Sequence, residues 1–299
     1  MAVGGRFAGR IRNLRTPRSL VRAARPLHWT KNLFVFAGLV FAAQLGDPGR
    51  WLQAICAFTA YCLASSASYI FNDVADVDYD RAHTVKRKRP LATGDLAPAR
   101  ALPAAGVLAS VALGLAVLLG PPSAGLMGAF LAMQFAYSLW LKHLVVVDLV
   151  VLAGLFVLRA AAGAIAIDAH LSPWLVACTA LLAFFLGLAK RRAQIVVVGA
   201  GSMRGRYALK GYSLPVLDVL AGMAMVIAIG TYSVYTFVAT SRIMTVTIPL
   251  VALGFARYAY LMRSRNAGEE PERTVVTDLP LLAIVTVWVV TSAIILMLQ

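Results

Sequence analysis

The sequence predicts an all-α integral membrane protein, a bundle of nine transmembrane helices with its N-terminus in the cytoplasm. Hydrophobic residues make up 60% of the 299 residues and charged residues only 14%, whereas soluble domains are about 45–50% apolar and about 25% charged. Nine mainly apolar segments are also close to the length of about 20 residues that a helix needs to cross a bilayer. They are residues 28–45, 51–71, 99–119, 123–141, 144–167, 172–190, 215–238, 243–262 and 279–298.

The segment before the first span is basic. Residues 1–25 contain seven arginines and no apolar core, so they predict a cytoplasmic basic arm rather than a cleavable signal peptide. Residues 26–299 are then expected to form a single transmembrane domain. Only Lys142 and His143 interrupt the fourth and fifth spans, which predicts a tight turn there.

The distribution of basic residues sets the orientation. With the N-terminus inside, 24 of the 28 Lys and Arg residues fall on the cytoplasmic side, as the positive-inside rule requires. The two long polar loops, 72–98 and 190–214, then face the cytoplasm, and we expect any functional site to open there, on the cytoplasmic side of the plasma (inner) membrane. Contact with anionic lipid explains the net charge of +15. No nucleic-acid-binding motif accompanies the charge, so nucleic acid is not expected as a partner.

An acidic cluster follows the second span. Asp73, Asp76 and Asp80 stand at i, i+3 and i+7 and would share one helix face, with Asn72 beside it and Asp78 pointing away. Close carboxylates repel one another, and Mg²⁺, which prefers oxygen ligands and bridges to substrate phosphates, would relieve this. The alternative is a solvated acidic helix end.

Polar and basic residues flank this cluster. Tyr69 extends the polar stripe into the second span, where polar residues are functional by default. The run from Lys86 to Arg89 follows. It is either positive-inside charge or a phosphate contact, since Lys and Arg both bind phosphate oxygens.

The acidic cluster and the basic run after it resemble the motifs of a known family. The stretch Asn72-Asp-Val-Ala-Asp-Val-Asp-Tyr-Asp80 resembles the NDxxDxxxD motif of the UbiA-type intramembrane prenyltransferases, and Lys86 to Gly94 resembles their KxRPLxxG continuation. The resemblance runs from about residue 25 to the end. It implies an enzyme in which Asn72, Asp73, Asp76 and Asp80 bind Mg²⁺ on a diphosphate, the three aspartates being catalytic.

The second loop departs from that family. Typical members carry another acidic motif after the sixth span, but here six bases lie between Lys190 and Lys210, with no carboxylate before Asp218. Basic residues suit a second phosphorylated substrate. One branch of the family fits this. The stretches that resemble it are residues 25–32 and 159–167, Lys190-Arg-Arg, and 210–213.

That branch transfers a 5-phosphoribosyl group from phosphoribosyl pyrophosphate to decaprenyl (polyprenyl) phosphate for cell-wall arabinan precursor synthesis. The expected reaction releases pyrophosphate and needs no strong general base. The candidate substrate-binding residues are Lys31, Tyr69, Asn72, Lys86, Arg87, Arg89, Lys142, Arg159, Lys190, Arg191, Gln194, Arg206, Tyr207 and Lys210.

Two other functions stay open. One is prenyl transfer from a prenyl diphosphate to an aromatic or other acceptor, against which the missing second aspartate motif argues. The other is a non-catalytic transporter or lipid-binding protein, for which internal repeats with broken helices would be a sign. The sequence also leaves open whether the chain forms a homo-oligomer.

Overall fold

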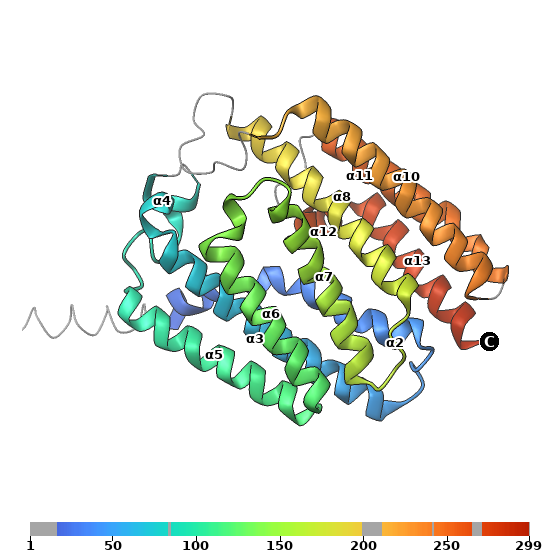
Figure 1. The fold of residues 1–299 in the computed structure, drawn as a ribbon, viewed down its shortest axis with the longest axis horizontal. Coiled ribbons are helices and arrows are strands. Elements are labelled where there is room, and N and C mark those ends of the chain that lie inside the picture. Colours follow the sequence, from blue (N-terminus) through green and yellow to red (C-terminus); the bar gives the residue numbers. More distant parts are fainter. Residues whose placement is uncertain (1–16, 83–84, 199–210, 241, 265–270, 299) are drawn as a thin grey trace, which may run out of the picture. The chain divides into compact units, whose positions relative to one another are not determined.

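A computed structural model describes residues 17–82, 85–198, 211–240, 242–264 and 271–298, and within these ranges the regular elements are all helices (Figure 1). This confirms the predicted all-α class. A short helix covers residues 17–24. The elements after it are the 3-10 helix η1 (Pro26–Phe36), α2 (Ala37–Phe41), α3 (Pro48–Ala75), α4 (Val77–Ala82), the 3-10 helix η2 (Lys86–Lys88), α5 (Pro98–Leu118), α6 (Pro121–Leu139), the 3-10 helix η3 (Leu141–His143), α7 (Val147–Ala166), α8 (Pro173–Val198), α10 (Leu214–Val238), the 3-10 helix η4 (Arg242–Thr247), α11 (Ile248–Ser264), α12 (Pro271–Thr277) and α13 (Leu279–Met297).

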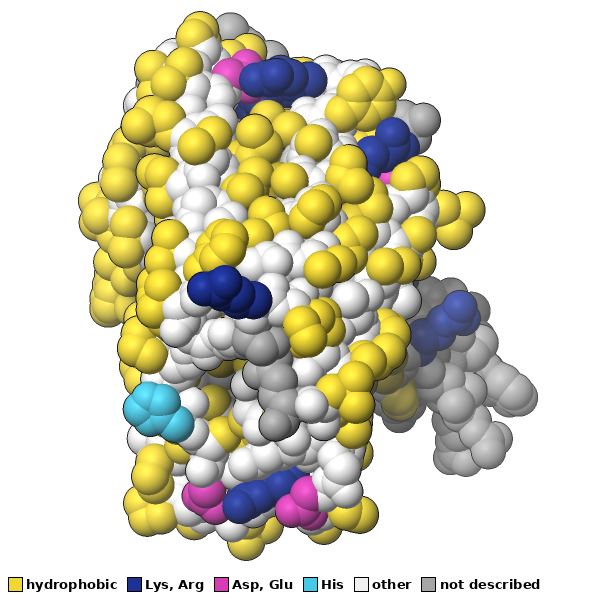
Figure 2. Space-filling model, turned by 90° about the vertical axis from the view of Figure 1, so that its right-hand side faces the viewer, with side chains coloured by type: hydrophobic (Ala, Val, Ile, Leu, Met, Phe, Trp, Pro, Cys, Tyr) yellow, Lys and Arg dark blue, Asp and Glu magenta, His cyan; other side chains and the backbone are white. Residues whose placement is uncertain are grey.

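Helical structure occurs in each of the nine predicted spans. Seven of the described helices are long and apolar enough to cross a membrane, and they contain α3, α5, α7, α8, α10, α11 and α13. The first predicted span and α6 are not among these seven, so the count of nine crossings is not confirmed. Figure 2 shows one face of the molecule, on which hydrophobic side chains predominate and charged ones are few. Such a surface suits contact with lipid.

The first predicted span differs most from expectation. Instead of one α-helix over 28–45, eleven residues form η1 and five form α2. This segment lies against α7 so closely that a Cβ atom added at Gly163 would be 1.7 Å from the carbonyl oxygen of Val35. Gly38 is equally enclosed, since its Cβ would meet Ala164 N at 2.5 Å. Backbone packing therefore holds the segment in place.

Two helices that carry predicted site residues are longer than expected. α3 continues to Ala75, past the predicted end at 71, and α8 continues to Val198, past 190. Lys190, Arg191 and Gln194 accordingly lie on a helix rather than in a loop. Prolines at the first or second position of α5, α6, α10 and α13 mark where these helices begin, because proline fits the first turn without losing a hydrogen bond.

The chain divides into two compact units. The first comprises Met1–Asn32 and Phe58–Trp140, and the second Leu33–Ala57 and Leu141–Gln299. In the first unit α5 and α6 lie side by side (Figure 1), and a core that includes Ala67, Ile70, Leu91 and Leu96 packs the 90–96 turn onto α3. In the second unit α8 lies between α7 and α10, and its core is centred on Phe185 and Leu188.

Candidate active site

The acidic cluster lies where α3 ends in the first unit. α3 and α4 are separated only at Asp76, and hydrogen bonds continue across it, from Asp76 N–H to Asn72 O at 2.9 Å and from Asp80 N–H to Asp76 O at 2.8 Å. Because the helical path is nearly continuous, Asp73 and Asp80 return to the same face. Both are 1% exposed, whereas the side chain of Asp78 is 90% exposed. The prediction that Asp78 points away is confirmed.

Arg89 joins the two buried carboxylates. Its Nη1 donates to Asp80 Oδ2 at 2.6 Å and to Asp73 Oδ1 at 3.1 Å. The position of Arg89 follows from its neighbours, since Pro90 and Leu91 are buried and Leu91 packs with Ile70 of α3. One of the four bases in the run from Lys86 to Arg89 thus reaches the acidic cluster.

The other predicted bases of this loop lie differently. Lys86 is partly buried, with its Nζ 5.0 Å from the centre of the Tyr79 ring, a cation–π contact. Arg87 is exposed. The basic run therefore presents several cations on the surface beside the one that is bound to the carboxylates.

Arg25 is a second cation at the cluster. It donates to Asp73 Oδ1 through Nη2, and its guanidinium stands over the ring of Tyr69, 5.1 Å from the ring centre. Its backbone has φ +52°, a conformation uncommon outside glycine, at the end of the helix over residues 17–24. Sequence reasoning used Arg25 only as part of a family-like stretch, and with Asp73 48 positions further along the chain there was no signal of the contact.

Each of the two buried carboxylates has one oxygen atom that accepts no hydrogen bond. Asp73 Oδ2 and Asp80 Oδ1 are buried and have no hydrogen-bond partner, although an unsatisfied buried acceptor is costly. Burial raises the pKa of Asp80, against the influence of Arg89. Two hard oxygen atoms without donors fit a divalent cation such as Mg²⁺, which takes oxygen ligands.

The predicted ligand set is only partly assembled. Asp76 is partly exposed, and among the described residues no group of three Asp, Glu, His or Cys side chains is placed to hold a metal ion. The structure thus brings together Asp73 and Asp80 of the three predicted aspartates.

The predicted residues of the second unit form a separate cluster. Arg191 is 2% exposed, and its Nε lies 2.6 Å from Asp148 Oδ2. Its Nη1 donates to Gln194 Oε1 at 2.5 Å. Asp148 of α7 is therefore the carboxylate that neutralises Arg191.

Arg159 lies inside α7 and is 3% exposed. It donates to Leu155 O at 2.8 Å and stands 5.4 Å from the centre of the Phe156 ring, so local contacts compensate part of its burial. Lys142 is also buried, at 6% exposed, while Lys31 and Lys190 are partly buried. The predicted residues Arg206, Tyr207 and Lys210 lie outside the described residues.

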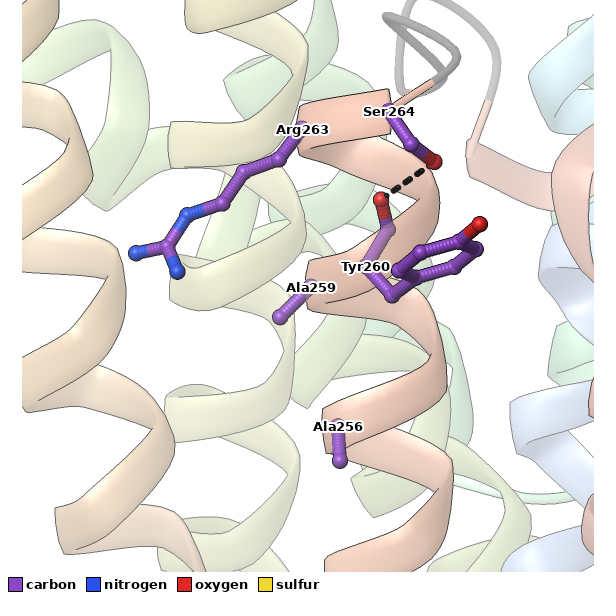
Figure 3. Close-up of a pocket in the computed structure, with 5 residues that line it drawn as sticks. All are labelled: Ala256, Ala259, Tyr260, Arg263 and Ser264. Carbon is purple, nitrogen blue, oxygen red and sulfur yellow. Dashed lines mark hydrogen bonds between the residues drawn. The ribbon is translucent and has the colours of Figure 1, made fainter.

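One surface hollow carries none of the predicted residues. It is lined by Ala256, Ala259, Tyr260, Arg263 and Ser264, all from α11 (Figure 3). The Ser264 hydroxyl donates back to Tyr260 O at 2.8 Å. This hollow lies on a single helix and contains none of the acidic cluster, so we assign no catalytic role to it.

Comparisons with known proteins agree with the motifs. Residues 32–277 match the model of the UbiA prenyltransferase family. The decaprenyl-phosphate phosphoribosyltransferase of Mycolicibacterium smegmatis is 32% identical over 287 residues, which cover 90% of each chain. The enzyme of that name from Corynebacterium glutamicum is 31% identical over 222 residues, which cover 73% of this chain and 67% of the relative.

Solved structures share the fold. A UbiA homolog from Archaeoglobus fulgidus bound to GPP and Mg²⁺ superposes with a TM-score of 0.73 at 19% identity, covering 93% of this chain and 99% of the homolog. An apo UbiA homolog from Aeropyrum pernix has a TM-score of 0.69 at 19% identity, covering 89% and 98%. At these identities the likeness concerns the fold.

Proposed function

Because the chain belongs to the UbiA prenyltransferase family, we propose that it transfers a 5-phosphoribosyl group from phosphoribosyl pyrophosphate to decaprenyl or another polyprenyl phosphate. The observation that carries this proposal is the pair of buried carboxylates, Asp73 and Asp80, with unused oxygens beside Arg25 and Arg89. The names of the relatives in M. smegmatis and C. glutamicum support the choice of substrates. In a cell that makes a cell-wall arabinan, the phosphoribosyl lipid would serve as a precursor for its synthesis.

In the proposed reaction an oxygen of the lipid phosphate forms a bond to C1 of the ribose, while the bond from C1 to the pyrophosphate oxygen breaks. Asp73 and Asp80, with Asn72 and Asp76 nearby in the chain, would hold Mg²⁺. The bound metal would neutralise charge on the departing pyrophosphate. Arg25 and Arg89 can bind phosphate oxygens through their planar guanidinium groups. The lipid phosphate is already an anion at neutral pH, so no side chain has to remove a proton from it.

Lys31, Tyr69, Lys86, Arg87, Lys142, Arg159, Lys190, Arg191 and Gln194 stay proposed substrate contacts, as do Arg206, Tyr207 and Lys210. We also propose that residues 26–299 form one catalytic domain, that residues 1–25 are a basic arm, and that the site faces the cytoplasm from the plasma membrane. The excess of bases on that side supports this orientation.

The test is transfer by the purified protein. With labelled phosphoribosyl pyrophosphate, decaprenyl phosphate and Mg²⁺, we expect a labelled lipid and an equal amount of pyrophosphate. Asp73→Asn and Asp80→Asn should each lower kcat by about 10²-fold or more, because charge stabilisation at the leaving group is lost. Asp78→Asn is the matched control, since Asp78 is exposed and forms a surface ion pair with Arg81.

If the protein forms no phosphoribosyl lipid but couples geranyl diphosphate to an aromatic acceptor, it is a prenyltransferase of the ordinary kind. Wild-type turnover in Asp73→Asn would remove the proposed metal site.

A further inference from the structure

Residues 24–29 form the turn that carries Arg25 to the acidic cluster. The helix over residues 17–24 ends at the start of this turn, and η1 begins within it at Pro26. Arg25 has φ +52°, and a backbone in such a conformation persists only when the surrounding structure over-determines it. A hydrogen bond from His28 N–H to Arg25 O, at 2.9 Å, closes the turn from inside. Further contacts come from α3.

Ser66 of α3 holds both sides of this turn. The residue is buried, at 1% exposed. Its hydroxyl donates to Ala24 O at 2.9 Å and accepts the indole N–H of Trp29 at 3.0 Å. A hydroxyl can make both bonds at once, because it has one hydrogen to donate and lone pairs with which to accept. Ser66 therefore bridges a residue before Arg25 and a residue after it.

The side chain of Arg25 meets the same face of α3 further along the helix. Ser66, Tyr69 and Asp73 stand at i, i+3 and i+7, positions that share one helix face. The Arg25 guanidinium lies 5.1 Å from the centre of the Tyr69 ring and donates to Asp73 Oδ1. All these residues belong to the first compact unit. One face of α3 thus holds the backbone of the turn at Ser66 and receives the guanidinium at Asp73.

We propose that Ser66 is a positioning residue that aims Arg25 at Asp73. Apolar packing in the core of the first unit holds the helix over residues 17–24, but this helix ends before Arg25, so the direction of that side chain depends on the turn. At Asp73 the guanidinium can bind pyrophosphate oxygens, a role that rests on the proposed function. The position of Arg25 does not depend on that function.

Ser68 offers a matched control on the same helix. It is 3% exposed, and its hydroxyl donates to Ala64 O at 2.9 Å, one turn earlier in α3. Ser68→Ala therefore removes a buried serine hydroxyl that binds only within its own helix. Trp29→Phe is a second test of the turn, since it removes the indole N–H and keeps an aromatic ring.

The experiment compares the full-length wild type with Ser66→Ala, Trp29→Phe, Arg25→Gln and Ser68→Ala. Two readouts are followed: the rate at which phenylglyoxal modifies Arg25, measured by mass spectrometry, and the Kd of pyrophosphate in the presence of Mg²⁺. In the wild type the Arg25 side chain is 20% exposed and paired with Asp73, so its modification should be slow. The exposed Arg22 gives the rate of an accessible arginine in the same sample.

We expect phenylglyoxal to modify Arg25 at least about fivefold faster in Ser66→Ala and Trp29→Phe than in the wild type, because the turn opens locally. The Kd of pyrophosphate should rise about tenfold in Ser66→Ala, as expected when a hydrogen bond to a charged group is lost. Ser68→Ala should match the wild type in both readouts. The double variant Ser66→Ala/Arg25→Gln should bind pyrophosphate no more weakly than Arg25→Gln alone, since both changes remove the same contact.

A wild-type modification rate of Arg25 in both Ser66→Ala and Trp29→Phe would overturn the positioning role. If Ser66→Ala does not fold, Trp29→Phe decides by the same criterion. Faster modification with an unchanged Kd of pyrophosphate would overturn the role at the phosphate, as would additive losses in the double variant or a wild type that binds no pyrophosphate. If the wild type binds pyrophosphate but transfers no phosphoribosyl group, the proposed function fails, and the same two readouts still decide this inference.

Discussion

The contact between Gly163 of α7 and the first hydrophobic segment gives a sharp prediction for Gly163→Ala. The new Cβ atom would lie 1.7 Å from Val35 O, and real Cβ atoms essentially never come within 3.0 Å of a neighbour. Both sides of the contact are backbone, so no side chain can rotate away. Alanine is favoured over glycine in a helix by about 1 kcal/mol, but overpacking costs about 1–3 kcal/mol or more. We expect the steric cost to win, with a net loss of up to about 2 kcal/mol.

The assay is thermal unfolding of detergent-purified protein, followed by tryptophan fluorescence. A loss of about 2 kcal/mol should lower the apparent Tm by about 3 °C. Gly222→Ala in α10 is the matched control, because nothing lies within 4 Å of its added Cβ atom, and its Tm should stay the same or rise slightly. Equal Tm values for the two variants would show that the first segment does not pack on α7 in this way.

Three further predictions follow from individual contacts. Asp278 caps α13 and binds the partly exposed Arg257 through two hydrogen bonds of 3.0 and 2.8 Å, so Asp278→Ala should cost about 0.5–2 kcal/mol in a denaturation assay through the lost cap; an unchanged stability would contradict the cap. Because the folded-state pKa of Tyr212 is raised from 10.0 to about 12, the unfolded chain loses this proton first, and the stability due to Tyr212 should decline between pH 10 and 12. The wild-type Tm should fall more steeply there than that of Tyr212→Phe, and parallel curves would refute this. Chelation of divalent cations should abolish transfer and added Mg²⁺ should restore it, and full activity in the presence of chelator would contradict the metal site. In addition, Mg²⁺ with pyrophosphate at about 100 times its Kd should raise the free energy of unfolding of the wild type by about 2.7 kcal/mol but should not stabilise Asp73→Asn.

The local parts of the acidic site were predictable because they depend on spacing along one helix. Positions i and i+7 return to the same face of a helix, and Asp73 and Asp80 are indeed buried together while Asp78 is exposed. The helical class and the approximate limits of the apolar segments were predictable for the same reason, because hydropathy is read over consecutive residues.

Contacts between distant residues could not be derived in this way. Arg25 and Arg89 both carry charge, but nothing in their neighbourhoods indicates that they, rather than Lys86 or Arg87, bind Asp73. The extension of α8 to Val198 was missed because Lys190, Arg191 and Arg192 looked like the end of a span. The charges of Arg191 and Arg192 are neutralised by Asp148 and Asp218, which lie far away in the sequence.

The sequence by itself determined a helical membrane protein with an acidic motif and an unusually basic second loop, because composition, helix length and charge are properties of neighbouring residues. The tertiary structure decided which charges meet. Burial makes an unpaired charge costly, so each buried carboxylate needs a cation brought by packing. Packing also decided that the first apolar segment forms η1 and α2, since a close approach of two backbones at Gly163 requires both segments to be in place.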